Sequence, residues 1–445
     1  MARAIPSLSG GGVRTGQLMA LRRDPLGLFR RVREECGELG HFRLAGRDVV
    51  FFSGPKAQEA FFRQPDEVFD PQPTSNELMR PIFGEGVVYD APPEKRREMI
   101  RSPALRDKNL RSSAEIIAAE TERMCETLGS EGELDLLDFT AELTIYTSSS
   151  CLIGRPFRES LTAEFSRKYF DLEVGTDAIG YLDSTVNIEA FRVRDRARER
   201  LTELVSEIIR ERQAMSEPPR DLLGILLSLA DDGRPRYSPA VITGILISTM
   251  FAGHHTSAGT AAWTLVELLR SEGMKRVVEQ LDGIYADGRD VSYQALREIP
   301  HLENAVKEAL RLHPPLIWLP RTALVDYAYE DFVVPKGTIV AMSTALSHLD
   351  PACFPEPERF DPDRFAPPRE EDLAHPWAYL PFGGGRHRCL GSNFALMQQK
   401  AIFSVLLRRF EFALAAPASC YEDDYRAMVV RPKQPFRVRY RRRNA

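Results

Sequence analysis

PFGGGRHRCLG, residues 381–391, sets a single thiol, Cys389, in a glycine-rich loop directly before an apolar segment, 390–412, that we expect to be helical. Glycines let the backbone approach the sulfur closely, and the free N–H groups at a helix N-terminus favour an anionic sulfur. A thiolate held in this way is a suitable axial ligand for haem iron. The alternative for an isolated cysteine is a buried structural residue after a turn. From these residues alone, both interpretations stay open.

Length, charge and cysteine spacing exclude several classes of protein. The chain has 445 residues, of which 43% are hydrophobic, so it can bury a large core. A net charge of −5 gives no sign of nucleic-acid binding. The other five cysteines show no CxxC spacing, so we expect neither a zinc site nor disulfides. No apolar run reaches the ~20 residues of a membrane span, and we predict a cytoplasmic protein.

A long apolar helix is expected from Ser238 to about Arg270, because Ser followed by Pro is a good helix start. Its middle, MFAGHHTSAGTAAW, carries Gly253 and Thr256, which weaken a helix, so some benefit must offset that cost. An unperturbed imidazole titrates near 6.5, which would suit His255 to a proton shuttle. Adjacent residues of a helix point about 100° apart, so we do not expect His254 and His255 to face one site.

Three further stretches carry information. Residues 71–99 read as a Pro-rich loop, because Pro81, Gly84 and Gly86 break helices. The segment EKRREMIRSPALR, residues 94–106, concentrates cations that are either a solvated face or partners for carboxylates. Further on, HLENAVKEALRLHPP places Glu308 and Arg311 on one helix face, and residues 316–340 alternate as short strands.

Taken together, FGGGRHRCLG, the Glu308/Arg311 pair and the Gly-x-x-Thr helix resemble the cytochrome P450 superfamily from about residue 25 to the C-terminus. The closer resemblance is to bacterial soluble sterol 14α-demethylases. It is carried by MFAGHHTSAGTAAWTLVEL (250–268), MRPIFGEGVVYD (79–90) and YEDDYRAMVVRPKQP (421–435). The resemblance implies a mainly α fold, the P450 helical prism with a small β-rich region. It also implies one domain, 21–445, after a Gly/Ser-rich flexible segment, 1–20.

The resemblance also implies roles for individual residues. Cys389 would be the axial ligand of haem b (iron protoporphyrin IX), and Thr256 with His255 would deliver protons. Glu308 and Arg311 would lock a downstream arginine, either Arg359 or Arg364; the distance before the thiolate favours Arg364. Haem contacts would come from Arg96, Arg97, Arg321, Phe382, Gly383 and His387. Substrate contacts would come from Asn76, Leu78, Met79, Phe83, Tyr89, Phe251, Ala252, Leu316, Trp318 and Met428, under a cover formed by the 76–89 loop and helices near 165–182.

By this resemblance the protein is a haem-thiolate monooxygenase that uses O₂ and electrons from a ferredoxin and its reductase. Its substrate would be large, apolar and sterol-like, with 14α-demethylation or hydroxylation as the reaction. Asn76 stands where the family has Tyr, and Trp318 is expected to narrow the pocket, which favours the alternative of another terpenoid, steroid or polyketide. A third hypothesis is a haem protein without turnover, against which Thr256 argues. Basic residues near the thiolate would dock an acidic ferredoxin: Arg386, Arg388, Lys400, Arg408 and Arg409.

Overall fold

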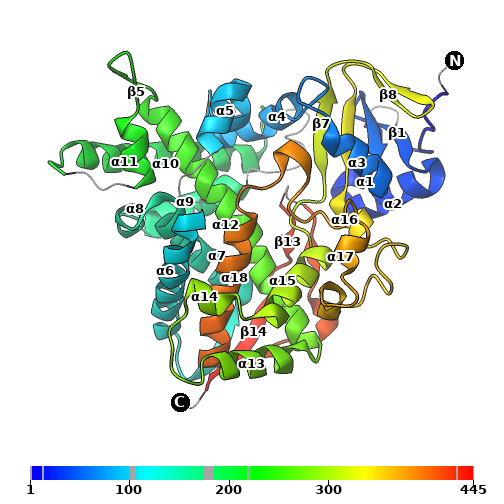
Figure 1. The fold of residues 1–445 in the computed structure, drawn as a ribbon. Coiled ribbons are helices and arrows are strands. Elements are labelled where there is room, and N and C mark those ends of the chain that lie inside the picture. Colours follow the sequence, from blue (N-terminus) through cyan, green and yellow to red (C-terminus); the bar gives the residue numbers. More distant parts are fainter. Residues whose placement is uncertain are drawn as a thin grey trace.

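Helices make up most of the molecule, and the strands gather mainly at the N-terminal side (Figure 1). The computed structural model describes residues 3–12, 15–100, 107–161, 163–174, 185–217, 221–426 and 429–443. Its α-helices are α1 (Leu18–Arg23), α2 (Pro25–Cys36), α3 (Pro55–Arg63), α4 (Gln72–Phe83), α5 (Pro93–Ile100), α6 (Asp107–Glu126), α7 (Leu136–Ser148), α8 (Arg155–Glu159), α9 (Ala163–Val174), α10 (Glu189–Gln213), α11 (Leu222–Ser228), α12 (Pro239–Arg270), α13 (Gly273–Ile284), α14 (Tyr293–Leu296), α15 (Pro300–Leu312), α16 (Thr344–His348), α17 (Glu371–Ala374) and α18 (Ser392–Arg409).

The strands are β1 (Leu39–Leu44), β2 (Arg47–Phe52), β3 (Phe69–Asp70), β4 (Glu131–Asp135), β5 (Ala230–Asp231), β6 (Arg234–Pro235), β7 (Leu319–Ala323), β8 (Tyr327–Tyr329), β9 (Phe332–Val334), β10 (Ile339–Met342), β11 (Phe410–Leu414), β12 (Asp423–Asp424), β13 (Arg431–Pro432) and β14 (Arg437–Arg442). Short 3₁₀ turns are η1 (Val88–Asp90), η5 (Pro362–Phe365), η6 (Gly385–His387) and η7 (Ala418–Cys420), and η3 (Ser149–Ile153) is a π turn. Among the described residues, no helix combines the length and apolar character needed to cross a membrane.

The largest sheet has the order β1-β2-β10-β7-β3, in which β2 and β10 are parallel and the other neighbours antiparallel. Strands β1 and β2 form an antiparallel pair around Gly46. Residues 1–20 were predicted to be flexible; in the part described they contact the sheet. Leu8 N–H donates to His41 O at 2.8 Å, and His41 N–H donates to Pro6 O at 2.8 Å, so the segment lies along β1.

The long helix α12 begins and ends where the sequence predicts. The Ser238 side chain accepts a hydrogen bond from Val241 N–H, Pro239 is the first helical residue, and the helix ends at Arg270. Two glycines allow neighbouring segments to approach closely. A Cβ at Gly253 would lie 2.9 Å from Ser148 Oγ of α7, and one at Gly244 would lie 2.2 Å from Phe83 O of α4. Close packing is therefore one benefit that offsets the weak helix propensity of these glycines.

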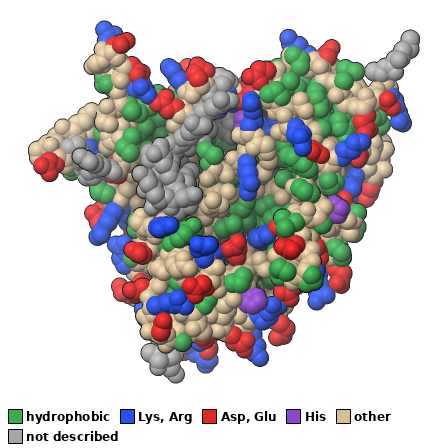
Figure 2. Space-filling view, in the orientation of Figure 1, with side chains coloured by type: hydrophobic (Ala, Val, Ile, Leu, Met, Phe, Trp, Pro, Cys, Tyr) green, Lys and Arg blue, Asp and Glu red, His purple; other side chains and the backbone are tan. Residues whose placement is uncertain are grey.

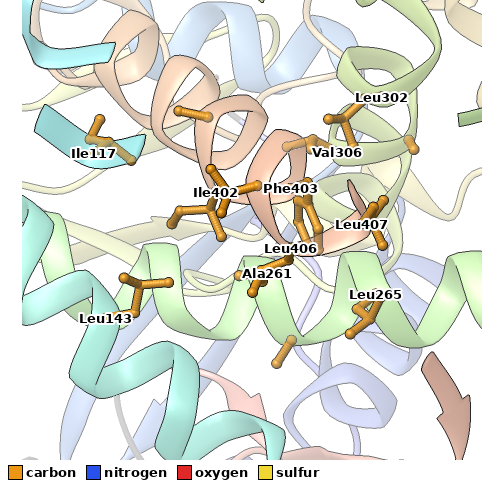
Figure 3. Close-up of a cluster of buried hydrophobic side chains, with 14 of the residues drawn as sticks. Ile117, Leu143, Ala261, Leu265, Leu302, Val306, Ile402, Phe403, Leu406 and Leu407 are labelled. Atoms are coloured by element: carbon orange, nitrogen blue, oxygen red, sulfur yellow. The ribbon is translucent and has the colours of Figure 1, made fainter. Parts of the chain in front are cut away.

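The main hydrophobic core surrounds α12 and α18 (Figure 3). Side chains from α6, α7, α12, α15 and α18 meet there, and the figure labels Ile117, Leu143, Ala261, Leu265, Leu302, Val306, Ile402, Phe403, Leu406 and Leu407. The helix that follows Cys389 is thus central to the core. It begins at Ser392, two residues later than expected, and ends at Arg409.

The expectation of a loop over 71–99 is wrong at both ends, because α4 runs through Pro81 to Phe83 and α5 begins at Pro93. Pro81 lies in the last turn, where its missing N–H removes one backbone hydrogen bond only. Gly84, with φ 101°, ends the helix, and its N–H donates to Arg80 O at 2.8 Å. Arg198 of α10 then donates from Nη2 to Phe83 O at 2.9 Å, which satisfies a carbonyl at the helix C-terminus.

Candidate active site

The loop that carries Cys389 is shaped by glycines whose positions admit no other residue easily. Gly385 has φ 62°, and a Cβ there would lie 2.2 Å from Phe62 O of α3. The loop then turns so that Cys389 N–H donates to Phe382 O at 2.9 Å. The thiol is accessible to solvent, although it is recessed among protein atoms. Burial raises its pKa, against the opposing effects of Gly391 N–H and Arg388, so the helix N-terminus alone does not ionise this thiol.

Two buried arginines from distant segments lie beside this loop, which itself carries His387. Arg96 of α5 and Arg321 of β7 are each 4% exposed. His387 Nε2 lies 2.5 Å from Asp66 Oδ1. Burial lowers the pKa of His387, the hydrogen bond with Asp66 raises it, and the charges of Arg321 and Arg96 lower it further. The imidazole therefore lies within electrostatic range of both arginines.

Asp66 completes this cluster. Burial would raise its pKa, but the hydrogen bond with His387 and the charges of His387, Arg386 and Arg96 outweigh burial and lower it. Buried guanidinium groups next to an accessible thiol form a donor set that fits haem, whose iron takes a sulfur ligand and whose two propionates take Arg and His. Arg97 was also expected at this site, and its side chain lies outside the described part of the structure.

A second buried network holds the segment between α15 and the Cys389 loop. Arg311 donates to both oxygens of Glu308, at 2.7 and 2.9 Å, and to the carbonyls of His348 and Pro357. Arg364 Nε donates to Glu308 Oε1 at 3.0 Å. Glu308, Arg311 and Arg364 are each at most 1% exposed, whereas the Arg359 side chain is 63% exposed and pairs with Glu356. The third member of the network is therefore Arg364.

The central turn of α12 presents Thr256 and two histidines. Thr256 Oγ1 donates to Ala252 O at 3.0 Å, four residues back. His255 stacks on Tyr169 of α9 and meets the edge of Phe251, with ring centroids 5.8 and 4.5 Å apart. Burial lowers the pKa of His255 to about 3, with a further contribution from Arg431. The expectation of an imidazole that titrates near 6.5 is wrong, and His255 is neutral at physiological pH.

A cavity of about 250 Å³ borders this turn of α12. Both histidines line it, so the expectation that they face different sites is wrong. Phe251, Ala258 and Val429 provide apolar walls, and the remaining lining residues come from α7, α9 and the C-terminal segment 431–434: Leu137, Asp138, Ala141, Glu142, Ile145, Arg167, Phe170, Arg431 and Gln434. The sequence interpretation missed His254 and the polar residues. The acidic residues of α7 fall on a helix with no motif to single them out.

The residues expected at the substrate site lie in different surroundings. Phe83 and Phe251 meet edge to face, with centroids 5.5 Å apart, and Met79 packs in the same cluster. Ala252 and Leu316 are exposed. Asn76 Nδ2 donates to Asp90 Oδ1 at 2.8 Å, and Asp90 Oδ2 accepts from Gly86 N–H at 2.6 Å. Asn76 thus connects α4 with η1.

Two expectations about side chains are corrected. The Trp318 ring stacks on Phe29 and lies near Phe51, with centroids 5.4 and 6.3 Å apart, so it packs in the N-terminal core instead of narrowing the pocket. Lys400 is 7% exposed and pairs with Glu303, so it adds nothing to a docking face. Charges of both signs are interspersed over the face drawn in Figure 2. The side chains of Leu78, Tyr89 and Met428, also expected at the substrate site, lie outside the described part.

The comparisons with known proteins agree on one family. The model of the family described as Cytochrome P450 matches residues 6–440. A protein named sterol 14alpha-demethylase from Mycolicibacterium vanbaalenii is 50% identical to this chain, over 99% of this chain and 98% of its own. One named obtusifoliol 14-alpha demethylase from Sorghum bicolor is 37% identical, over 99% and 91%.

Among solved structures, a retinoic acid-bound cyanobacterial CYP120A1 superposes with a TM-score of 0.84, and the match covers 100% of both chains. Its sequence identity is 24%, so this likeness concerns the fold. It agrees with the expected helical prism and its small β-rich region.

Proposed function

The chain belongs to the cytochrome P450 family and is a haem-dependent monooxygenase; on this basis we propose that it oxidises a sterol and removes the 14α-methyl group. The observation that carries the proposal is the 50% identity with a sterol 14alpha-demethylase along nearly the whole of both chains. The match, which covers 99% of this chain, spans the segments 79–90 and 250–268, which border the candidate site. The apolar contact between Phe83 and Phe251 is in keeping with a rigid hydrocarbon substrate.

Each member of the site has a distinct task in this proposal. Cys389 would hold the iron, and Arg96, Arg321 and His387 would hold the propionates. When bound, the haem supplies the activation of O₂ that inserts one oxygen atom into a C–H bond. Thr256 and the neutral His255 would relay protons beside the substrate through their own O–H and N–H groups, while Phe83, Phe251 and Val429 would exclude bulk water. Removal of a methyl group as formate requires three such oxidations at one carbon.

A second candidate is hydroxylation of a different polycyclic terpenoid, steroid or polyketide. One observation favours it: Asn76 replaces the expected tyrosine, and its amide is engaged with Asp90. An aromatic wall is thereby exchanged for a polar contact within the protein, which alters the space available to substrate.

The cofactor and partners follow from the same proposal. We infer haem b as the cofactor and a ferredoxin with its reductase as the electron donor. Arg386 and Arg388 are exposed next to Cys389 and would meet an acidic partner, while Arg409 pairs with Glu122. Charge reversal at Arg388 should slow reduction by ferredoxin, whereas reversal at Arg437, an exposed arginine of β14, should not. The cytoplasm remains the predicted location.

The test is a spectral titration of the ferric protein with a 14α-methyl sterol, followed by turnover. A saturable shift of the Soret band, with formation of the 14-desmethyl product and formate, is the expected result. The matched control is the same sterol without the 14α-methyl group, which should bind without yielding formate. Failure of several 14α-methyl sterols to shift the band would refute the sterol assignment and direct the search to other polycyclic compounds.

A further inference from the structure

A stripe of buried hydroxyl groups runs along α7 where it faces α12. Thr140, Thr144 and Ser148 are spaced four residues apart, which places them on one face of the helix. Thr140 Oγ1 lies 2.9 Å from Leu136 O of its own helix and 3.1 Å from Ala258 O of α12, and Ser148 Oγ donates to Gly253 O at 3.0 Å. All three side chains are at most 2% exposed. Buried hydroxyls are costly unless they are hydrogen-bonded, and this stripe is matched to the central turn of α12.

Thr144, in the middle of the stripe, contacts an imidazole. Its Oγ1 lies 2.9 Å from His254 Nδ1. The same oxygen lies 2.8 Å from Thr140 O and 3.1 Å from Ala141 O. The shortest of these contacts, 2.8 Å to Thr140 O, exists as a hydrogen bond only if the hydroxyl donates, because a carbonyl oxygen carries no proton. We therefore place the single hydroxyl proton on that side. The Thr144 oxygen is then an acceptor, and the proton of the bond to His254 belongs to Nδ1.

This direction decides the tautomer of His254. The ring is 3% exposed, and burial lowers its pKa to about 3, so it carries a single proton at neutral pH. With that proton on Nδ1, Nε2 keeps its lone pair. The ring lies beside His255, with centroids 4.3 Å apart, and both rings line the same cavity. His255 directly precedes Thr256, so an oriented acceptor stands next to the groups that handle protons.

We propose that Thr144 is a positioning residue for proton supply: it fixes His254 with its proton on Nδ1, and the acceptor Nε2 orients the hydrogen bonds of the cavity that leads to His255 and Thr256. The proposal rests on the proposed monooxygenase function for its kinetic consequence. In this role His254 accepts a hydrogen bond and takes up no net proton, and the protons delivered are those of solvent. A hydroxyl group of α7 thereby determines which nitrogen of His254 accepts a hydrogen bond along the route of proton supply.

The first experiment reads the tautomer directly. Protein labelled with ¹⁵N-histidine is brought to the diamagnetic ferrous–carbonyl form, and the Nδ1 and Nε2 shifts of His254 are assigned with a His254→Gln variant. The native protein and Thr144→Ser, which keeps the hydroxyl, should show a protonated Nδ1. Thr144→Val, which has nearly the same shape without the hydroxyl, should shift His254 toward protonation on Nε2. Thr140→Val, one turn away, is the matched control and should leave the shifts unchanged.

The second experiment measures how the tautomer of His254 affects the use of electrons during turnover. The fraction of NAD(P)H electrons lost as hydrogen peroxide should rise several-fold in Thr144→Val and stay near native in Thr144→Ser and Thr140→Val. An unchanged tautomer in Thr144→Val overturns the proposal, as does a changed tautomer without extra peroxide. An equal effect in Thr140→Val also overturns it, because loss of packing would then explain both. A native protein that neither binds nor oxidises sterols contradicts the proposed function instead, and the tautomer is still judged by its shifts.

Discussion

Three glycines of α12 offer a stringent test, because one substitution should have three different effects along the same helix. Glycine to alanine in a helix interior stabilises by about 1 kcal/mol when the new methyl group meets no obstacle. At Gly259 the nearest atoms to a Cβ are Pro432 Cδ at 3.6 Å and Val430 O at 3.8 Å, which are ordinary contacts. Gly259→Ala should therefore stabilise the protein.

The other two positions are obstructed to different degrees. At Gly253 a Cβ meets Ser148 Oγ at 2.9 Å and Leu152 Cδ1 at 3.0 Å, both side chains that can yield. Overpacking of about 2 kcal/mol would outweigh the helix gain and leave a net loss of about 1 kcal/mol. At Gly244 the obstacle is the backbone oxygen of Phe83 at 2.2 Å, so the end of α4 must move away. The net loss there should be at least about 2 kcal/mol.

Thermal unfolding of the three variants at equal haem content measures this ranking. For a chain of 445 residues the unfolding entropy is about 0.9 kcal/mol per kelvin, so these free energies correspond to Tm shifts of about +1, −1 and −2 °C or more. Such shifts are resolved by replicate calorimetric scans at one scan rate. Shifts of the same sign at all three positions, or a Gly244→Ala variant as stable as Gly259→Ala, would refute the packing described for α12.

Three further predictions address charge, acid stability and the α4 segment. Glu308→Gln should destabilise by about 3–5 kcal/mol and weaken haem retention, because the buried guanidinium groups of Arg311 and Arg364 lose their anion; Glu356→Gln, an exposed carboxylate, is the control, and equal effects would contradict the argument. His254, His255 and His348 have pKa values lowered by burial to about 3. Below about pH 6.5 the unfolded chain thus binds protons that the native chain does not, and stability falls by up to about 1.4 kcal/mol per pH unit for each histidine. His348→Gln should flatten this fall between pH 6 and 4 in urea unfolding, and an unaltered slope would count against a neutral His348. Asn76→Ala removes the hydrogen bond to Asp90, worth about 1 kcal/mol, and should speed limited proteolysis within residues 71–90, whereas an unchanged rate would show that α4 does not depend on it.

Features set by local chemistry were predictable from the sequence. Ser238 and Pro239 define the start of α12 because a side-chain acceptor and a proline suit the first turn of any helix. The spacing of Glu308 and Arg311 places them on one face whatever surrounds them. The choice of Arg364 over Arg359 rested only on its distance before the thiolate, and the hydrogen bond to Glu308 agrees with it.

Features set by distant segments were not predictable. The helix through Pro81 depends on Arg198, more than a hundred residues away, which binds the carbonyl at the end of α4. The orientation of Trp318 depends on Phe29 and Phe51, which supply stacking partners on one side of its strand. His254 was not expected at the same site as His255, because adjacent residues of a helix point in different directions. The cavity beside α12 is nevertheless wide enough for both rings to line it.

The network of Glu308 has a consequence for exchanging parts between relatives. Arg311 donates to the carbonyls of His348 and Pro357, and Arg364 donates to that of Glu356. The conformation of residues 348–364 therefore depends on hydrogen bonds with α15, which ends some forty residues earlier in the chain. A chimera whose crossover falls between Leu312 and Arg364 would combine α15 from one parent with all or part of residues 348–364 from another. Such crossovers should be tolerated only where both parents keep the same number of residues from His348 to Arg364, and that interval is best inherited together with α15 as one block.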